Sequence, residues 1–132
     1  MTVHFPDLKT FKRSRKPNNY LVAPDEYCGE SEPDAFAPVF TKTPAELFQA
    51  VESLAADRSS WAVKHSDAST GQIPIVATTR LLRFKDDVFV KVLPAGTGGS
   101  SFAVYSGSRL GHSDLGKNRS RVTEMLDALK SA

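Results

Sequence analysis

Apolar residues recur at the 3.6-residue spacing of an amphipathic helix in two stretches of the chain, residues 44–57 and 117–130. The first stretch follows a capping-box sequence, in which Thr43 takes the N-cap position, Pro44 the first helical position and Glu46 the third. The second stretch places four apolar side chains on one face: Val122, Met125, Leu126 and Leu129. Each stretch therefore predicts a helix with one buried side.

Between the two predicted helices the spacing of apolar residues changes to two, which is the period of a β-strand. This alternation predicts four strands, at residues 61–65, 73–84, 88–93 and 101–108. Pro74 is expected at the start or on an edge of the second strand, because proline cannot donate a ladder hydrogen bond. Lys85, Asp86 and Asp87 form the short link to the third strand, so the second and third strands are expected to pair as a hairpin.

The order of these elements, one helix, four strands and a final helix, predicts a single α+β domain. We expect a mostly antiparallel four-stranded sheet, with the central and the C-terminal helix against one face, within residues 17–132, preceded by a basic N-terminal arm at residues 1–16. Residues 16–38 hold four prolines and are expected to run as an extended segment that wraps the core. The third predicted strand directs a row of side chains to one face of the sheet: Val88, Val90 and Val92.

Length, composition and cysteine content exclude several classes of protein. The 132 residues include 17 Lys or Arg and 15 Asp or Glu, with a formal net charge of +2, which is typical of one globular domain and not of a collagen, a coiled coil or a disordered chain. No apolar run approaches the ~20 residues of a membrane span, and no secretory leader is expected. The single cysteine, Cys28, cannot form an internal disulfide, so a cytoplasmic location is expected.

The charge is unevenly distributed along the chain. The basic arm carries five Lys or Arg side chains and one Asp, whereas residues 25–34 carry five carboxylates and no base, so the two segments could neutralise each other. Phe5, Leu8 and Phe11 have threefold spacing, which leaves open a short amphipathic helix on an anionic membrane, or phosphate contacts with nucleic acid. Because such charge runs are more often solvated, we do not expect nucleic acid or membrane contact through residues 9–16.

The densest group of polar residues lies between residues 108 and 121, at the junction between the last strand and the last helix. Gly111 and Gly116 permit a tight turn there. Ser113 and Asp114 can accept hydrogen bonds from the free amides at the start of the helix. The composition therefore indicates a strand-to-helix junction whose side chains serve either structure or binding.

Two segments of the chain, Arg80 to Val88 and Tyr105 to Val122, resemble the uncharacterised family known as domain of unknown function 1499. The shared pattern is Phe-x-Asp-Asp-Val, followed by Ser-Arg-x-Gly-x-Ser-Asp-Leu-Gly-x-Asn-Arg-x-Arg-Val. Pro17-Asn18 matches an N-terminal Pro-Asn pair of that family, so the resemblance extends over most of the chain. Many members carry Cys directly after this pair and an aromatic residue later, where this chain has Asn19 and His112. The resemblance implies a shared fold and a shared polar cluster, but no reaction.

Two interpretations of this polar cluster are open. In the first, arginines pair with carboxylates, linking Asp86 or Asp87 to Arg109 or Arg119, and fix the hairpin against the last helix. In the second, several arginines stay incompletely neutralised near the helix N-terminus. A small carboxylate or phosphate is then held by Arg109, Arg119, Ser113 and the amides near Leu115. The candidate ligand-binding residues are Arg80, Arg83, Asp86, Asp87, Ser108, Arg109, Ser113, Asp114, Asn118, Arg119 and Arg121.

Motifs for nucleophilic catalysis and for metal binding are weak. Cys28 lies in an acidic segment, which is expected to raise the pKa of its thiol and make it a poor nucleophile. The chain has no Gly-x-Ser-x-Gly motif, and His4, His65 and His112 are scattered rather than spaced as metal ligands. No metal or cofactor is therefore expected.

These observations favour a noncatalytic binding or interaction module with a small-anion site at residues 108–121, and with a protein partner of unknown identity. One alternative is an enzyme of unknown reaction that uses the same Arg, Asp and Ser cluster. Another is a peripheral envelope-associated protein.

Overall fold

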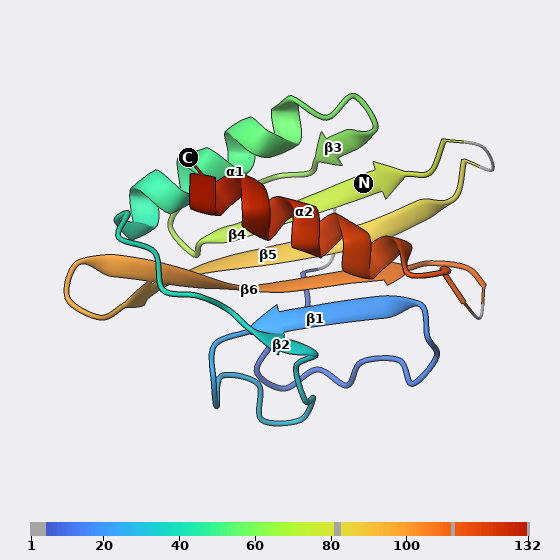
Figure 1. Ribbon diagram of the computed structural model, residues 1–132, viewed down its shortest axis with the longest axis horizontal. Coiled ribbons are helices and arrows are strands. Elements are labelled where there is room, and N and C mark those ends of the chain that lie inside the picture. Colours follow the sequence, from blue (N-terminus) through green and yellow to red (C-terminus); the bar gives the residue numbers. More distant parts are fainter. Residues whose placement is uncertain (1–4, 81–82, 112, 132) are drawn as a thin grey trace.

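In the computed structural model, which describes residues 5–80, 83–111 and 113–131, two helices lie on one face of a six-stranded sheet (Figure 1). Both helices match their predicted ranges to within one residue. The elements are β1 (Asn19–Ala23), β2 (Ala35–Phe36), α1 (Pro44–Ala56), β3 (Trp61–Val63), β4 (Gln72–Thr78), β5 (Lys85–Ala95), β6 (Gly99–Ser108) and α2 (Lys117–Ser131).

The strands lie in the order β2-β1-β6-β5-β4-β3, with β1 and β2 parallel and the other neighbouring pairs antiparallel. The predicted single α+β domain is confirmed, but the predicted four-stranded antiparallel sheet is wrong. Both additional strands come from residues 16–38. β1 buries three consecutive residues, Leu21, Val22 and Ala23, so it lacks the alternation that marks a half-buried strand. β2 has only two residues, too few for any period to be read.

The hairpin of β4 and β5 is present, but its turn lies before the predicted position. Asp86 and Asp87 belong to β5 rather than to the turn, and Asp86 lies opposite Ala77 of β4. The connection between the strands consists of residues 79–84, of which 81–82, part of the predicted strand, lie outside the described residues. Arg121 pairs with Asp86, and Arg109 pairs with Asp87. These ion pairs stabilise the two carboxylates at positions inside a strand.

The main hydrophobic core lies between the sheet and the two helices. The predicted row of valines, Val88, Val90 and Val92, is buried on this face, where it packs with Phe102 and Val104 of β6. The capping box at the start of α1 is also present. The helices contribute Leu47, Phe48, Val51, Ala55, Val122, Met125 and Leu129 to this core. Packing of α2 against β1 and β6 places its N-terminus at the end of the sheet where β6 finishes.

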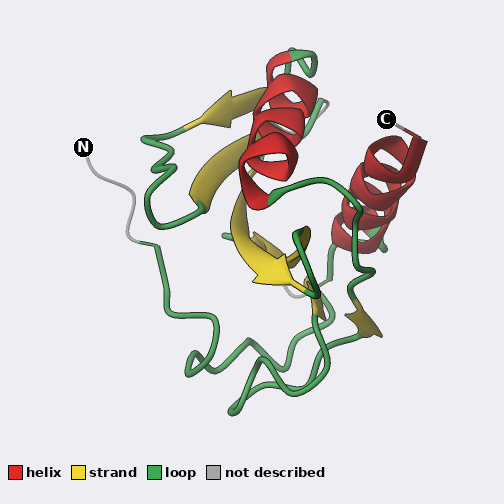
Figure 2. Ribbon diagram, turned by 90° about the vertical axis from the view of Figure 1, so that its left-hand side faces the viewer, coloured by secondary structure: helices red, strands yellow, loops and turns green. Residues whose placement is uncertain are grey.

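The opposite face of the sheet is covered by irregular segments from the first third of the chain (Figure 2). Leu8 is buried, and Phe5 and Phe11 pack edge-to-face on Phe89 and Tyr105, with 5.2 and 5.1 Å between ring centroids. This segment forms a turn and no helix. In this structure the three side chains fill a second apolar cluster rather than the apolar face of a helix.

The basic arm and the acidic segment neutralise each other at one point. Nη2 of Arg13 lies 2.6 Å from Oδ2 of Asp34. Arg13 also donates to the side-chain oxygen of Asn19 at 2.8 Å, and so links the arm to the start of β1. From residue 5 onward, the described part of the arm lies against the sheet.

The two helices are shorter than a lipid bilayer requires. α1 has 13 residues and α2 has 15, whereas a span needs ~20 apolar residues. Within the described ranges, no helix is long and apolar enough to cross a membrane.

Candidate functional site

The polar residues of the sequence motif meet where α2 begins, beside the start of β1 and the end of β6. Asn118, in the first turn of α2, is fully buried. Its side-chain oxygen accepts hydrogen bonds from the Ser106 hydroxyl at 2.6 Å and from Nη1 of Arg121 at 2.7 Å. Its side-chain nitrogen donates to the carbonyl oxygen of Asn18 at 2.9 Å and to Oγ of Ser108 at 3.0 Å. Because a carboxamide both donates and accepts, this one side chain links α2 to β6 and to the residue before β1.

The loop before α2 is held by its own side chains. Oδ1 of Asp114 accepts from the Gly116 amide at 2.8 Å, and Oδ2 accepts from the Asn118 amide at 3.1 Å. Oγ of Ser113 accepts from the Leu115 amide at 3.3 Å. The predicted capping role is therefore confirmed for Asp114, which accepts from the Asn118 amide in the first turn of α2, whereas Ser113 bonds within the loop before the helix. Because these oxygens already engage amides at the helix start, fewer amides remain for an anion.

Two arginine–aspartate pairs join the sheet to its surroundings. Arg121 lies 2.9 Å from Asp86, with side chains 11% and 3% exposed, respectively. On the more exposed side of β5, Arg109 forms a fork with Asp87, with Nη2 and Nε at 2.8 and 3.1 Å from Oδ1. This hydrogen bond raises the pKa of Arg109. The predicted pairing of Asp87 with Arg109 is thus present, whereas Asp86 pairs with Arg121 rather than with Arg109 or Arg119.

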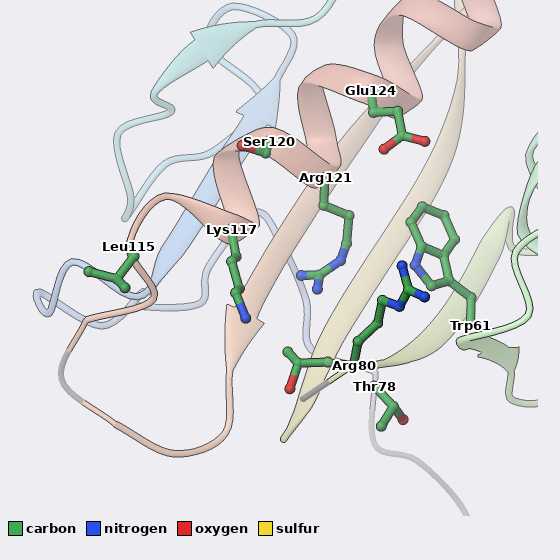
Figure 3. A pocket seen from close by; sticks show the side chains of 9 residues that line it. Trp61, Thr78, Arg80, Leu115, Lys117, Ser120, Arg121 and Glu124 are labelled. Carbon is green, nitrogen blue, oxygen red and sulfur yellow. The ribbon is translucent and has the colours of Figure 1, made fainter. Parts of the chain in front are cut away.

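A groove of about 700 Å³ runs between α2, the end of β4 and the edge strand β3 (Figure 3). Figure 3 shows the side chains of Arg80, Lys117 and Arg121 directed into the space between the helix and the strands, while Leu115 points away. The residues that line the groove are Trp61, Thr78, Thr79, Arg80, Leu115, Lys117, Ser120, Arg121 and Glu124.

The charges of this groove are only partly neutralised. Arg121 is paired with Asp86, and Glu124 is paired with Arg58, whose guanidinium lies over the Trp61 ring. By contrast, Arg80 and Lys117 are exposed, and neither forms an ion pair with a residue that the structure describes. Two cations therefore remain available to a ligand.

The other sequence-predicted residues lie outside the groove. Arg83 is exposed in the connection between β4 and β5. Arg119 lies on α2, where it lines a shallow hollow with Thr123 and Asp127. Arg109 lies beside the sheet, where it is paired with Asp87, whereas Arg119 lies on the outside of α2. The structure therefore does not bring these two arginines together in one site. The structure does gather Asp86, Ser108, Asp114, Asn118 and Arg121 around the start of α2, and His112 lies outside the described residues.

Of the nine described residues that line the groove, two, Arg80 and Arg121, were predicted from the sequence and seven were missed. Trp61 lies on an edge strand of three residues, where it is half-buried and packs against the main core as well as lining the groove. Lys117 and Ser120 were not selected, although they and Arg121 lie three and four residues apart on α2 and so share one side of the helix. Helical spacing around the motif arginine was the signal that could have identified them.

Cys28 and the acidic side chains offer little reactive chemistry. Burial raises the pKa of the Cys28 thiol, and the nearby charge of Arg13 opposes this shift. The predicted direction is confirmed, but the cause is desolvation rather than acidic neighbours. Among the described residues, no group of three or more His, Cys, Asp or Glu side chains is placed to hold a metal ion.

Comparison with known proteins adds a family but no reaction. No curated protein matches the chain. A family model described as "Protein of unknown function (DUF1499)" matches residues 10–129, so that it includes the Pro17-Asn18 pair, the β5 carboxylates and the junction before α2. Because the match covers nearly all of the 132 residues, the chain belongs to this family of unknown function, DUF1499.

Proposed function

We propose that this protein is a noncatalytic binding module that holds a small anionic molecule in the groove between α2 and the end of β4. The observation that carries this proposal is the pair of uncompensated cations, Arg80 and Lys117, on the walls of the groove. Compared with the site expected from sequence, the proposed site retains Arg80 and Arg121, leaves out Arg109 and Arg119, and adds Lys117.

The lining indicates the chemical class of the ligand. The guanidinium of Arg80 matches the planar geometry of a carboxylate or phosphate, and the ammonium of Lys117 adds a second positive charge. The Trp61 ring and the hydroxyls of Thr78 and Ser120 can contact the rest of the molecule. A volume of about 700 Å³ is typical of pockets for small organic molecules. The ligand is therefore an organic carboxylate or phosphate with an apolar or aromatic body.

The state of the carboxylates supports binding rather than catalysis. Glu124 is the one carboxylate among the groove residues that the structure describes, and it is paired with Arg58. Asp86 is paired with Arg121, and Asp114 accepts from amides at the start of α2. A general base needs an oxygen free to take a proton from the substrate, and these oxygens have other partners.

A cytoplasmic location belongs to the same proposal. It is supported by the single cysteine, Cys28, which gives the chain no internal disulfide to maintain.

The proposal is tested by ligand-induced stabilisation, with phenyl phosphate and inorganic phosphate as probes. Phenyl phosphate at about tenfold its dissociation constant is expected to raise the melting temperature of the wild type by about 4 °C. The double variant Arg80→Gln/Lys117→Gln should lose this shift. The matched control, Arg119→Gln, removes an exposed cation from the same helix and should keep it.

Two results would overturn the proposal. One is the absence of any shift in the wild type with either probe. The other is an equal shift in the wild type and in the Arg80→Gln/Lys117→Gln variant. If Arg109→Gln alone removed the shift, the ligand would lie beside β5, at the location expected from sequence, rather than in the groove.

A further inference from the structure

One end of the sheet brings together two connections that are far apart in sequence. β4 and β6 end there, and β5 and α2 begin there, so the described parts of the two connections, residues 79–80 with 83–84 and residues 109–111 with 113–116, lie at the same end of the sheet (Figure 1). Asp86 lies opposite Ser108 in the ladder. The Arg109 amide donates to the carbonyl oxygen of Lys85 at 3.3 Å, which links the two connections at their bases.

Large apolar side chains are exposed at this end. Phe84 is 46% exposed, Leu110 69% and Leu115 91%. Leu115 also has a positive φ of 55°, a conformation that non-glycine residues seldom adopt. Neither core packing nor local backbone preference explains a leucine at that position. Exposed large apolar side chains gathered at one end of a sheet are typical of an interaction surface.

Unpaired cations surround these apolar side chains. Arg80, Arg83 and Lys85 flank Phe84, and Lys117 follows Leu115. The segment before β1 reaches the same end, because the side chain of Asn18 donates to the carbonyl oxygen of Gly111 at 2.8 Å and the Asp114 amide donates to that of Pro17 at 3.3 Å. That segment adds two more exposed cations, Arg15 and Lys16, although the charge pattern alone predicts no membrane contact through residues 9–16. In the part of the chain that the structure describes, none of these six forms an ion pair: Arg15, Lys16, Arg80, Arg83, Lys85 and Lys117.

We propose that this basic–apolar tip, formed by Phe84, Leu110 and Leu115 with the six cations around them, docks on the surface of an anionic lipid bilayer. Apolar side chains at such a tip enter the boundary between headgroups and acyl chains, and Lys and Arg contact the negative headgroups. The surface charge selects an anionic partner. The two leucines favour lipid over nucleic acid, because an aliphatic side chain offers no stacking face and no hydrogen bond to a base.

This docking surface shares three residues with the proposed ligand groove, Arg80, Leu115 and Lys117, and these are left unchanged in the test. Phe84 and Leu110 do not belong to the described groove lining, and the groove needs neither of them. Variants at Phe84 and Leu110 therefore test the docking surface separately from the groove.

The test is co-sedimentation of the full chain with vesicles of phosphatidylcholine, alone or mixed with phosphatidylserine. The wild type is expected to sediment with the mixed vesicles only, and less so at high salt, because salt screens the cations. Phe84→Ser/Leu110→Ser should weaken the partition roughly tenfold or more. The matched control Phe36→Ser/Val39→Ser removes two residues that are 65% and 66% exposed near β2, and it should bind as the wild type does.

A second variant, Arg83→Gln/Lys85→Gln, tests the charge separately and should weaken binding roughly tenfold at low salt. All replaced side chains are exposed or half-exposed, and circular dichroism verifies that the variants fold. The proposal is overturned if the wild type does not sediment with the mixed vesicles, or if Phe84→Ser/Leu110→Ser binds them as strongly as the wild type does. It is also overturned if Phe36→Ser/Val39→Ser loses as much binding. Binding of a DNA duplex that depends on Arg83 and Lys85 but not on Phe84 and Leu110 would identify nucleic acid as the partner instead.

Discussion

The side-chain nitrogen of Asn118 donates a hydrogen bond to the backbone carbonyl oxygen of Asn18, 2.9 Å away and 100 residues earlier in the chain. This bond joins the first turn of α2 to the residue that precedes β1. Asn18 in turn donates from its side chain to the carbonyl oxygen of Gly111 at 2.8 Å. The Pro-Asn pair near the N-terminus and the polar motif near the C-terminus are therefore two parts of one hydrogen-bonded junction, and the same junction supports one end of the ligand groove.

Asn118→Ala should destabilise the fold strongly. The substitution removes the acceptor of the buried Ser106 hydroxyl, whereas the carbonyl oxygen of Asn18 keeps the Ser108 amide as a donor. A buried donor left unsatisfied costs about 1–3 kcal/mol, so we expect a loss in that range in the free energy of unfolding. Urea denaturation measures this loss. Gln49→Ala, at an exposed position of α1, is the control and should change stability by less than about 0.5 kcal/mol.

The two arginine–aspartate pairs should contribute differently to the free energy of unfolding. Arg121→Met leaves Asp86 as a buried charge without its ion-pair partner, which costs about 3–5 kcal/mol in comparable sites. Arg109→Met breaks a fork to Asp87 that is open to solvent, and should cost no more than about 1 kcal/mol.

A double-mutant cycle checks the buried pair. Arg121→Met combined with Asp86→Ala should destabilise less than the sum of the single variants, because the second substitution removes the orphaned charge. Additive losses would contradict a direct interaction between Arg121 and Asp86. Equal losses for Arg109→Met and Arg121→Met would contradict the role assigned to burial.

Local signals in the sequence were sufficient for parts of the fold. The capping box of Thr43 and Glu46 is contained within four residues, and the alternation of valines in β5 reflects burial on a single face. β1 was missed for a physical reason: it is covered by α2 on one face and by the N-terminal segment on the other, so three successive residues are buried. A strand buried on both faces has no period of two.

The candidate site was harder to predict because its partners are distant in sequence. Asp86 was placed in a turn, the usual position for aspartate, since nothing local shows that Arg121 will neutralise it in a strand. In the same way, the motif indicated many arginines but not which of them have carboxylate partners. Among the residues that the structure describes, Arg109 has such a partner and Arg80 does not, and this difference depends on where Asp87 lies after folding.

The capping box of α1 should give stability a specific pH dependence. The backbone amide and hydroxyl of Thr43 bond to the carboxylate of Glu46 and lower its pKa. A lowered pKa in the folded state means that the charged form stabilises the fold above the ordinary pKa of glutamate, and that this stabilisation is lost as the pH falls through the lower, folded value. Stability should therefore decline below about pH 4.

The variant Glu46→Gln isolates this contribution. Its stability should be lower than that of the wild type at neutral pH, and the difference should shrink as acid protonates Glu46. Thr43→Ser keeps the cap hydroxyl and should retain the wild-type pH profile. A difference between Glu46→Gln and wild type that is constant from neutral to acidic pH would contradict this assignment.

The thiol of Cys28 should react slowly in the folded protein. Burial in the second apolar cluster raises its pKa, so only a small fraction is thiolate at neutral pH, and the thiolate is the nucleophile. Alkylation by iodoacetamide should accelerate when urea unfolds the chain, because the thiol then returns to water.

Arg13→Gln should slow the alkylation of the folded protein further, because the positive charge of Arg13 opposes the increase in the pKa of Cys28. The control Arg13→Lys retains that charge and should change the alkylation rate less. Equal alkylation rates in the folded and unfolded chain would show that Cys28 is not desolvated, and the packing of the N-terminal segment over the sheet would then need revision.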